Sequence, residues 1–511
     1  MMELKLLRDS VQMEQPLGNG QSQAVVEGEI TLPGGLREEA RVLHADAMAA
    51  LESAESMQDR MHVSGRVVFH VLYTQGAPDK VQCIEAAADF THLCDLPGAT
   101  PRADAFAQAA VEQVQASVNG GRLSMKAVVR IDARAVLDAP LEVLTGVEAE
   151  AGTELRTSEA LLARTVARGG SDVLLREEFD LPSSLQIRET LYAVATPMLT
   201  DVSGGQGRIG FSGQVLLEAV HASDMPGKPV VVTRHTLPLE QSVDLTGENG
   251  DLLQGRIAVK DVAVASQEAG DGERTLRTEV LLNLQGWADR QETVTVLSDA
   301  YTTDGDDLQL TRREVTMRTG DLRVRTAESG KTTLLLPESA PPVRSVLAAF
   351  ASPVVMQREQ SGGKMNVQGT LSTRLIYMTD DTSAPVSVLQ ETPFRMSFSL
   401  QSADEDFIRL TVSEVDAVPV TSDRVELKYV MHLDAEGLRK EQATLVTDAQ
   451  PVSAPVPTRD VVLYFVQPGE SLWDIARRYR IPVSAIRRLN PALSGQPKVG
   501  QGIVVWRRQC S

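Results

Sequence analysis

Histidine, cysteine and acidic side chains are the groups of this chain best able to hold a metal or transfer a proton, and their spacing favours neither role. Seven histidines are scattered between His44 and His432, and no HExxH pair occurs. The sequence has neither a Walker A loop nor a GxSxG nucleophile elbow. Acidic pairs such as Glu38-Glu39 and Asp306-Asp307 have the character of solvated surface. We therefore expect no catalytic residue, no metal site and no cofactor, and a protein that is not an enzyme.

Three cysteines, Cys83, Cys94 and Cys510, give no metal-ligand spacing and no even set for disulfides. This number fits a reducing cytosol. Buried free thiols are the expected state of Cys83 and Cys94, and a cross-strand disulfide in an oxidising compartment is the alternative.

The chemistry that the sequence does favour is binding, and it is concentrated in the last fifty residues. A short alternating run of apolar residues ends at Pro468-Gly469, as a strand does. Ser471, followed three residues later by Asp474, predicts a capped helix start, because each side chain reaches the other's free backbone N–H. One apolar face at helical spacing then follows, formed by Leu472, Ile475, Ala476 and Tyr479.

A second short helix is predicted after Pro482. We expect Ser484 to cap it and Asn490-Pro491 to end it, because a residue before proline avoids the helical region. Residues 503–506, Ile-Val-Val-Trp, then form a closing strand. The segment is therefore a βααβ unit with a thin core.

This unit resembles a LysM domain, the small module that binds N-acetylglucosamine polymers such as peptidoglycan. The matching positions are Val466, Gly469, Ser471, Leu472, Ile475, Ala476, Leu489, Asn490, Val499, Gly500, Gln501, Ile503 and Val504. In the family, the sugar lies in a shallow groove between two loops. The resemblance places one wall of this groove at Gly469, Glu470, Ser471 and Leu472, and the other at Asn490, Pro491, Ala492 and Leu493.

Alternatives stay open for several of these groove residues. Leu472, Ile475, Ile486 and Leu489 are also expected in the core, and Ser471 and Asn490 are candidates for helix caps as much as for ligand contacts. The chain departs from the family at Glu470, where Asp is common, and at Val505-Trp506, where an apolar residue followed by proline is usual.

The rest of the chain contains a threefold internal repeat. Residues 61–73, 209–221 and 365–377 align without gaps, and their glycines Gly65, Gly213 and Gly369 are 148 and 156 residues apart. Leu-Pro pairs precede these glycines by nearly equal intervals, and V-x-x-V pairs begin at Val111, Val259 and Val412. A period of this length indicates whole domains rather than solenoid turns.

Each repeat is predicted to be mainly β. In residues 61–73 apolar side chains alternate along one face, with Val68 and Leu72 as interruptions. Hairpin turns are expected at residues 119–121, 269–272 and 421–423. The matching glycine is expected to relieve crowding or form a bulge. Short helices are expected after each Leu-Pro pair, for example at residues 35–51, where Leu36, Ala40, Leu43 and Ala47 share a face.

The repeat is similar to the SPOCS domain of endospore-forming bacteria. SPOCS-like repeats followed by a C-terminal LysM domain resemble the spore coat morphogenetic proteins of the SipL and SpoVID type. This resemblance implies a non-enzymatic role on the mother-cell side of the forespore, in tethering the coat. It also implies spore coat proteins as partners, including the coat basement-layer ATPase.

Charge is unevenly divided. Residues 460–511 contain eight basic and three acidic residues, a net charge of +5, which leaves −24 for residues 1–459 of the total of −19. A basic head on an acidic stalk would be steered towards an acidic partner. Alternatively, the arginines form the solvated faces of two short helices. The acidic stalk argues against nucleic acid as the main partner.

No stretch reaches the roughly 18 apolar residues of a spanning helix. The opening, MMELKLLRDSVQMEQ, has no apolar h-region, so no secretory signal is expected. These features predict a cytoplasmic protein of the mother cell, at the forespore surface or spore coat, without a membrane span.

The expected organisation is a mainly β chain of three SPOCS-like repeats at 1–148, 149–304 and 305–447, a Pro/Ala-rich linker at 448–459, and a LysM domain at 460–507. The linker is expected to let the head reach roughly 40 Å from the stalk. The favoured function is a coat scaffold with the LysM head as its docking module. The alternative is a cell-wall or spore-cortex protein that binds peptidoglycan or N-acetylglucosamine oligomers.

Overall fold

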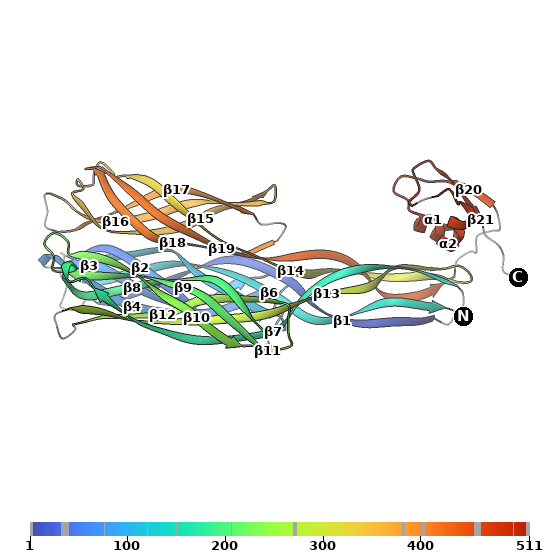
Figure 1. Cartoon of the computed structure of the whole chain (residues 1–511), viewed down its shortest axis with the longest axis horizontal. Helices are drawn as coiled ribbons and strands as arrows, with labels where there is room; N and C mark the ends of the chain where they lie inside the picture. The colour runs from blue at the N-terminus through green and yellow to red at the C-terminus, as the bar shows by residue number, and fades with distance from the viewer. Residues whose placement is uncertain are drawn as a thin grey trace.

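The structure is a computed structural model that describes residues 4–31, 40–75, 77–119, 121–149, 152–205, 207–268, 273–380, 384–399, 404–453, 461–493 and 495–506. Antiparallel strands dominate it, and the two α-helices of these residues both lie in the C-terminal segment. The predicted mainly β chain with a small α+β C-terminal domain is therefore confirmed. Long pairs of antiparallel strands run from an elongated body to the end where the N-terminus and the C-terminal domain lie (Figure 1).

The strands form three successive sets, which we call the first, second and third repeats. The first contains β1 (Leu4–Thr31), β2 (Arg41–Met57), β3 (Arg60–Gln75), β4 (Ala77–Asp95), β5 (Asp104–Asn119) and β6 (Arg122–Ala149). The second contains β7 (Thr153–Leu181), a 3₁₀ turn (Ser183–Leu185), β8 (Ile187–Gly205), β9 (Arg208–Ser223), β10 (Val230–Asp244), β11 (Thr246–Gly247), β12 (Leu252–Glu268) and β13 (Arg274–Thr302). The third contains β14 (Asp307–Leu335), β15 (Ser345–Ser361), β16 (Lys364–Met378), β17 (Val386–Ser399), β18 (Asp404–Thr421) and β19 (Arg424–Val452).

Each repeat is a sandwich of two antiparallel sheets. In the first repeat the strand orders are β2-β3-β4 and β1-β6-β5, and the other two repeats have corresponding sheets, with the short β11 added beyond β7. The alternating residues of β3 point into the space between the sheets, where Val63, Val67 and Phe69 are fully buried against Ala127 and Val129 of β6. The period of two thus places one face of each central strand in a core.

The predicted helix at residues 35–51 is wrong. Residues 41–57 form β2, which pairs with β3 from Arg41 opposite Thr74 to Met57 opposite Arg60, and residues 35–39 lie outside the described part. Alanine, leucine, methionine and glutamate favour helices by less than about 1 kcal/mol per residue, and pairing along β3 outweighs this preference. After the second Leu-Pro pair there is one 3₁₀ turn, and no α-helix follows the third in residues 337–344.

Two of the predicted hairpin turns are confirmed. Asn119 pairs with Arg122 across the first, and Thr421 pairs with Arg424 across the second. The corresponding turn at 269–272 lies outside the described residues.

Of the two predicted roles of the matching glycines, relief of crowding is confirmed, because each glycine lies opposite a β-bulge of the neighbouring strand and forms none itself. Their partners at the bulges are Leu51 for Gly65, Leu199 for Gly213 and Val355 for Gly369. A Cβ on Gly213 would lie 2.2 Å from the carbonyl oxygen of Met198, and one on Gly369 would lie 2.0 Å from that of Val354. Because the bulge turns this carbonyl onto the neighbouring strand, only glycine fits at the position.

Replacing Gly213 by alanine should therefore lower the free energy of unfolding by about 1–3 kcal/mol, since the new methyl group must displace backbone. Gly205, at the end of β8, is the matched control, because a Cβ there has nothing within 4 Å. Gly205→Ala should be neutral or stabilise by roughly 0.4–1 kcal/mol. Chemical denaturation compares the two, and equal unfolding midpoints would contradict the crowding argument.

The three repeats pack around a common axis, which the spacing of the repeat alone left open. At one end Leu72, Val220 and Ile376, which occupy the same position in β3, β9 and β16, meet in one buried cluster. Towards the other end the strand pairs β1–β6, β7–β13 and β14–β19 share a second core. It is formed by Val11, Met13, Leu141, Val143, Leu162, Val296, Val315, Met317 and Leu445. The "interrupting" Leu72 of the sequence pattern is therefore a contact between repeats.

An arginine joins the three repeats between these two clusters. Arg318 of β14, only 3 % exposed, bonds Glu14 of β1 and Asp289 of β13 at 2.5 Å each, and Asp321 at 2.7 Å. Glu14 also accepts the Thr165 N–H of β7 at 2.8 Å. Burial by itself lowers the pKa of Arg318, but the three carboxylates outweigh burial and hold this pKa above its usual value. The guanidinium thus stays charged and holds one side chain from each repeat.

The C-terminal domain has the predicted βααβ order, with β20 (Val461–Phe465), α1 (Leu472–Tyr479), α2 (Val483–Leu489) and β21 (Gly502–Trp506). The prediction that Ser484 caps the second helix is wrong. Pro482 takes the N-cap position, and Ser484 lies inside the first turn.

The segment predicted as a linker begins later than residue 448. Strand β19 continues to Val452, and Asp448–Val452 pair with Asp307–Thr311 of β14. Residues 454–460 lie outside the described part.

Candidate binding sites

The LysM-like helices are held by a small apolar core. Leu472, Ile475, Ile486 and Ile503 are at most 2 % exposed, and they pack with Val466 between the helices and the two-stranded sheet. Of the four residues expected in the core, Leu489 is only half-buried. Leu472 therefore supports its groove wall from within.

Two of the predicted groove residues have structural roles. The Ser471 hydroxyl accepts the Asp474 N–H while Asp474 accepts the Ser471 N–H, which completes the capping box at the start of α1. The Asn490 side chain donates to the carbonyls of Ile486 and Val504 and accepts the Val504 N–H at 2.9 Å. Asn490 thus ties the end of α2 to β21.

The remaining predicted groove residues lie on two loops. Gly469 has a φ of 81°, which favours glycine, and it is exposed at the turn after β20. Pro491 and Ala492 are exposed beyond α2, and Leu493 is half-buried. The Leu472 backbone N–H donates to the side-chain oxygen of Gln496 at 3.5 Å, so residue 496 lies beside the first loop. The first wall therefore offers the exposed turn at Gly469, and the second offers the apolar side chains of Pro491, Ala492 and Leu493.

Glu470 is bound within its own domain. Its carboxylate accepts hydrogen bonds from the Tyr464 hydroxyl at 2.6 Å and from the Gln467 N–H at 3.0 Å. These bonds hold the pKa of Glu470 below its usual range. The carboxylate therefore stays ionised beside the predicted groove.

The C-terminal domain packs on the outer end of the β7–β13 strand pair, where Thr153 lies opposite Thr302. Tyr301 of β13 is fully buried among the apolar residues of this domain, with the Trp473 ring edge-on at 5.0 Å. The Tyr301 hydroxyl donates to the carbonyl of Ile481 at 2.7 Å. The linker was expected to let the head reach roughly 40 Å from the stalk, whereas the structure has the C-terminal domain packed against the body.

Polar contacts surround this aromatic pair. Asp299 accepts the Trp473 indole N–H at 2.7 Å and pairs with Arg477. Arg480, 4 % exposed, donates to the carbonyls of Thr302 and Gly305 at 3.0 and 2.7 Å. Two arginines of the basic head therefore bind the body of the same chain. No sequence signal pointed to Tyr301, a single aromatic residue some 170 positions from its partners.

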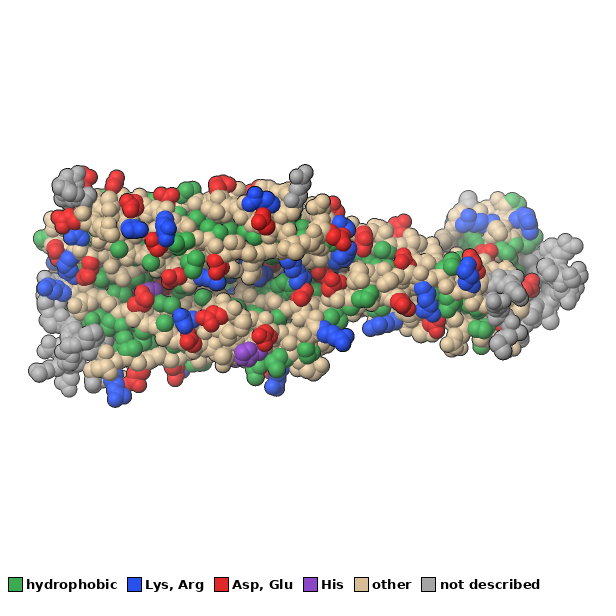
Figure 2. Space-filling model, turned by 90° about the horizontal axis from the view of Figure 1, so that it is seen from below, with side chains coloured by type: hydrophobic (Ala, Val, Ile, Leu, Met, Phe, Trp, Pro, Cys, Tyr) green, Lys and Arg blue, Asp and Glu red, His purple; other side chains and the backbone are tan. Residues whose placement is uncertain are grey.

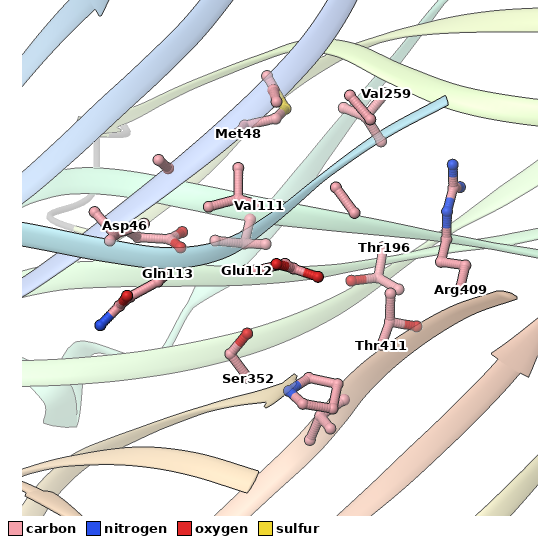
Figure 3. Close-up of a pocket in the computed structure, with 18 of the residues that line it drawn as sticks. Asp46, Met48, Val111, Glu112, Gln113, Thr196, Val259, Ser352, Arg409 and Thr411 are labelled. Atoms are coloured by element: carbon pink, nitrogen blue, oxygen red, sulfur yellow. The ribbon is translucent and has the colours of Figure 1, made fainter. Parts of the chain in front are cut away.

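A second site lies between the repeats. A cavity of about 1920 Å³ is lined mainly by β2, β5, β8, β12, β15 and β18, each of which is an edge strand of its sheet, and residues of other strands, such as Arg323 of β14 and Arg374 of β16, complete the lining. Asp46 of β2, Glu112 of β5 and Arg409 of β18 line it on different walls (Figure 3). Arg409 spans the repeats with two long contacts, to the carbonyl of Ile257 at 3.4 Å and to the Gln108 side chain at 3.5 Å.

The two cysteines that the structure describes both lie on β4. Cys83 and Cys94 are free thiols, and Cys510 lies outside the described part. Burial raises the pKa of Cys83 to about 12, so this thiol stays protonated and unreactive. Within the ranges that the structure describes, no group of three or more His, Cys, Asp and Glu side chains is placed to hold a metal ion. The helices in those ranges are too short or too polar to cross a bilayer.

Comparison with protein-family models gives two matches. Residues 40–119 match the SPOCS domain of SipL, and residues 464–506 match the LysM domain. The first match covers β2 to β5 of the first repeat, and the second covers the βααβ unit. Searches of curated proteins and of solved structures found no match.

Both matched domains are non-catalytic binding domains. Together they indicate a sporulation protein that carries a peptidoglycan-binding module. The chain therefore has the domain combination of a SPOCS-plus-LysM sporulation protein, with its SPOCS domain at residues 40–119 and its LysM domain at residues 464–506.

Proposed function

We propose that this protein is a non-enzymatic scaffold of the spore coat, which tethers coat proteins to the forespore surface with the LysM domain as its docking module. The observation that carries the proposal is the packing of the LysM domain against the body. The three repeats share buried cores, and Tyr301 fixes the LysM domain to the tip of the second repeat. A binding domain that is held in one orientation on a long body suits a tethering role better than a catalytic role.

We further propose that the body consists of three SPOCS-like domains at 1–148, 149–304 and 305–447. Strand pairing supports this division, because β1 pairs with β6, β7 with β13 and β14 with β19, although β6 ends at Ala149 and β19 at Val452. Residues 448–452 join the third domain, since they extend the pairing of β19 with β14.

The proposed partners are spore coat proteins, including the coat basement-layer ATPase, in the mother cell. The surface of the body supports this choice. In the view of Figure 2, acidic and basic side chains are interspersed on it, and no single apolar face dominates. Its net charge of −24 makes it a poor ligand for nucleic acid.

The alternative function is binding of peptidoglycan in the wall or cortex. It is favoured by the LysM match and by the exposed loops at Gly469 and Pro491–Ala492. In both functions we propose the same groove, with Gly469, Glu470, Ser471 and Leu472 facing Asn490, Pro491, Ala492 and Leu493. The two functions differ in whether this groove holds sugar or protein.

Replacing Ala492 by glutamate should weaken binding at this groove about tenfold or more, because a charged side chain is placed where an apolar sugar face or partner must pack. Ser484→Glu is the matched control, since Ser484 is exposed at the other end of α2. Leu472 and Asn490 are unsuitable positions, because their substitution also removes core packing or the tie to β21.

The test uses the full chain and both variants in two assays. Co-sedimentation with insoluble peptidoglycan measures glycan binding, and capture from lysates of sporulating cells measures binding of coat proteins. The scaffold function predicts retention of coat proteins that Ala492→Glu loses and Ser484→Glu keeps. Retention on glycan alone would favour the alternative function, and equal behaviour of both variants would rule out this groove.

A further inference from the structure

The inner edges of the three sandwiches meet around the central cavity without pairing. Each of the six edge strands pairs on one side only, β2 with β3 and β5 with β6, for example. Within the described residues, no backbone hydrogen bond joins one of these edges to another. Outward N–H and C=O groups of an edge strand are a ready template for a further strand.

Two of the three corresponding edges are blocked by proline. Pro197 of β8 lies opposite Val215, two residues beyond Gly213, and Pro353 of β15 lies opposite Leu371, two residues beyond Gly369. A proline in an edge strand removes an outward N–H and prevents pairing with an added strand. The corresponding residue of β2 is Ala49, opposite Val67, and β2 contains no proline. The β2 edge is therefore the open one of the three.

Small side chains and solvent access leave room at this edge. Ala45, Ala47, Ala49 and Ala50 all line the cavity, and β2 is half-exposed throughout residues 45–51. A strand occupies about 160 Å³ per residue if its neighbours lie about 4.8 Å away within a sheet and about 10 Å away across sheets. The cavity volume of about 1920 Å³ therefore accommodates a segment of roughly ten residues.

A half-buried carboxylate on β2 indicates the charge that an added strand would need. Asp46 of β2 lines the cavity and points into it (Figure 3), and no cationic side chain of the described residues lies within ion-pair distance. His70, opposite Asp46 on β3, lies 3.4 Å from Glu85 instead. Burial raises the pKa of Asp46, as expected for a carboxylate without a full counter-charge. An incoming basic side chain would supply that charge, and the acidic body would attract it.

From these features we propose that residues 45–51 of β2 bind an extended, basic segment of a partner polypeptide by β-strand addition inside the central cavity. Main-chain hydrogen bonds to β2 supply the affinity, and pairing of a lysine or arginine with Asp46 selects the segment. This site is separate from the LysM groove, and it does not depend on what that groove binds.

Fluorescence anisotropy with the full chain tests this site. The probes are labelled ten-residue peptides of alternating lysine and threonine, of alternating glutamate and threonine, and of alternating lysine and proline. The lysine–threonine peptide should bind at least about tenfold more tightly than either of the others. The lysine–proline peptide has the same charge but cannot form a strand, so equal affinity for it would overturn the proposal, as would failure of the lysine–threonine peptide to bind.

Variants locate the binding edge. Ala49→Pro, which copies the proline of β8 and β15, and Asp46→Asn should each weaken binding about tenfold. Asp201→Asn, at an exposed acid of β8 outside the cavity, should leave it unchanged. Hydrogen exchange of the wild-type chain provides a second measurement, which does not depend on correct folding of the proline variant. The wild-type amides of residues 45–51 should exchange more slowly with the peptide bound, and unchanged exchange there would contradict binding at β2.

Discussion

Replacing Arg318 by alanine is expected to lower the free energy of unfolding by about 3–5 kcal/mol. The guanidinium is 3 % exposed and bonds Glu14, Asp289 and Asp321, which belong to all three repeats. Its removal leaves Asp289 and Asp321 without an ion-pair partner among the described residues and Glu14 with Arg168 alone, at 3.6 Å, and water cannot replace the guanidinium without opening the junction. Urea denaturation followed by circular dichroism measures the change.

Arg313→Ala is the matched control for this prediction. Arg313 lies on the same strand, β14, and is exposed, so its loss should change stability by no more than about 0.5 kcal/mol. Hydrogen exchange should also accelerate in Arg318→Ala at Thr165, whose N–H is bound to Glu14. Equal stability of the two variants would show that the repeats are held together by their apolar clusters alone.

Replacing Tyr301 by alanine is expected to release the LysM domain from the body. The ring is fully buried between the two, and loss of a large buried aromatic side chain costs about 3–5 kcal/mol. Tyr301→Phe keeps the packing and removes only the hydrogen bond to the Ile481 carbonyl, so it should cost about 1 kcal/mol and leave the domain docked.

Electron paramagnetic resonance can measure this docking as the distance between two spin labels. The labels are placed at Glu159 of β7 and Ser484 of α2, which are both exposed. The wild type and Tyr301→Phe should give one narrow distance distribution, and Tyr301→Ala a broad one. Tyr377→Ala is the control, because Tyr377 is equally buried in the third repeat and its hydroxyl also bonds a carbonyl. A narrow distribution in Tyr301→Ala would contradict the role given to this contact.

Local patterns predicted the strands and the LysM unit well. Alternation along residues 61–73 indicated a strand with a buried face, and the Ser471–Asp474 pair indicated the start of α1. Both features depend on neighbours within a few residues, which the sequence displays directly. Strand β2 was mistaken for a helix because its alanine, leucine and methionine residues favour one, while its pairing with β3 involves residues up to 33 positions away.

Contacts between repeats were harder to predict. Leu72, Val220 and Ile376 appear in the sequence as breaks in alternation, and their recurrence at one position of each repeat was the available signal. Arg318 and Tyr301 gave no such signal, because their partners lie on other repeats and on the LysM domain. The predicted groove residues remain a proposal, and two of them, Ser471 and Asn490, have structural roles that their positions as candidate caps had indicated.

The tethering function is tested most directly by imaging a fluorescently tagged full chain in sporulating cells, beside a copy that lacks residues 460–511. The scaffold function predicts a ring of fluorescence around the developing forespore for the full chain, and its loss for the truncated copy. Fluorescence on the walls of vegetative cells, or an unchanged ring in the truncated copy, would contradict it.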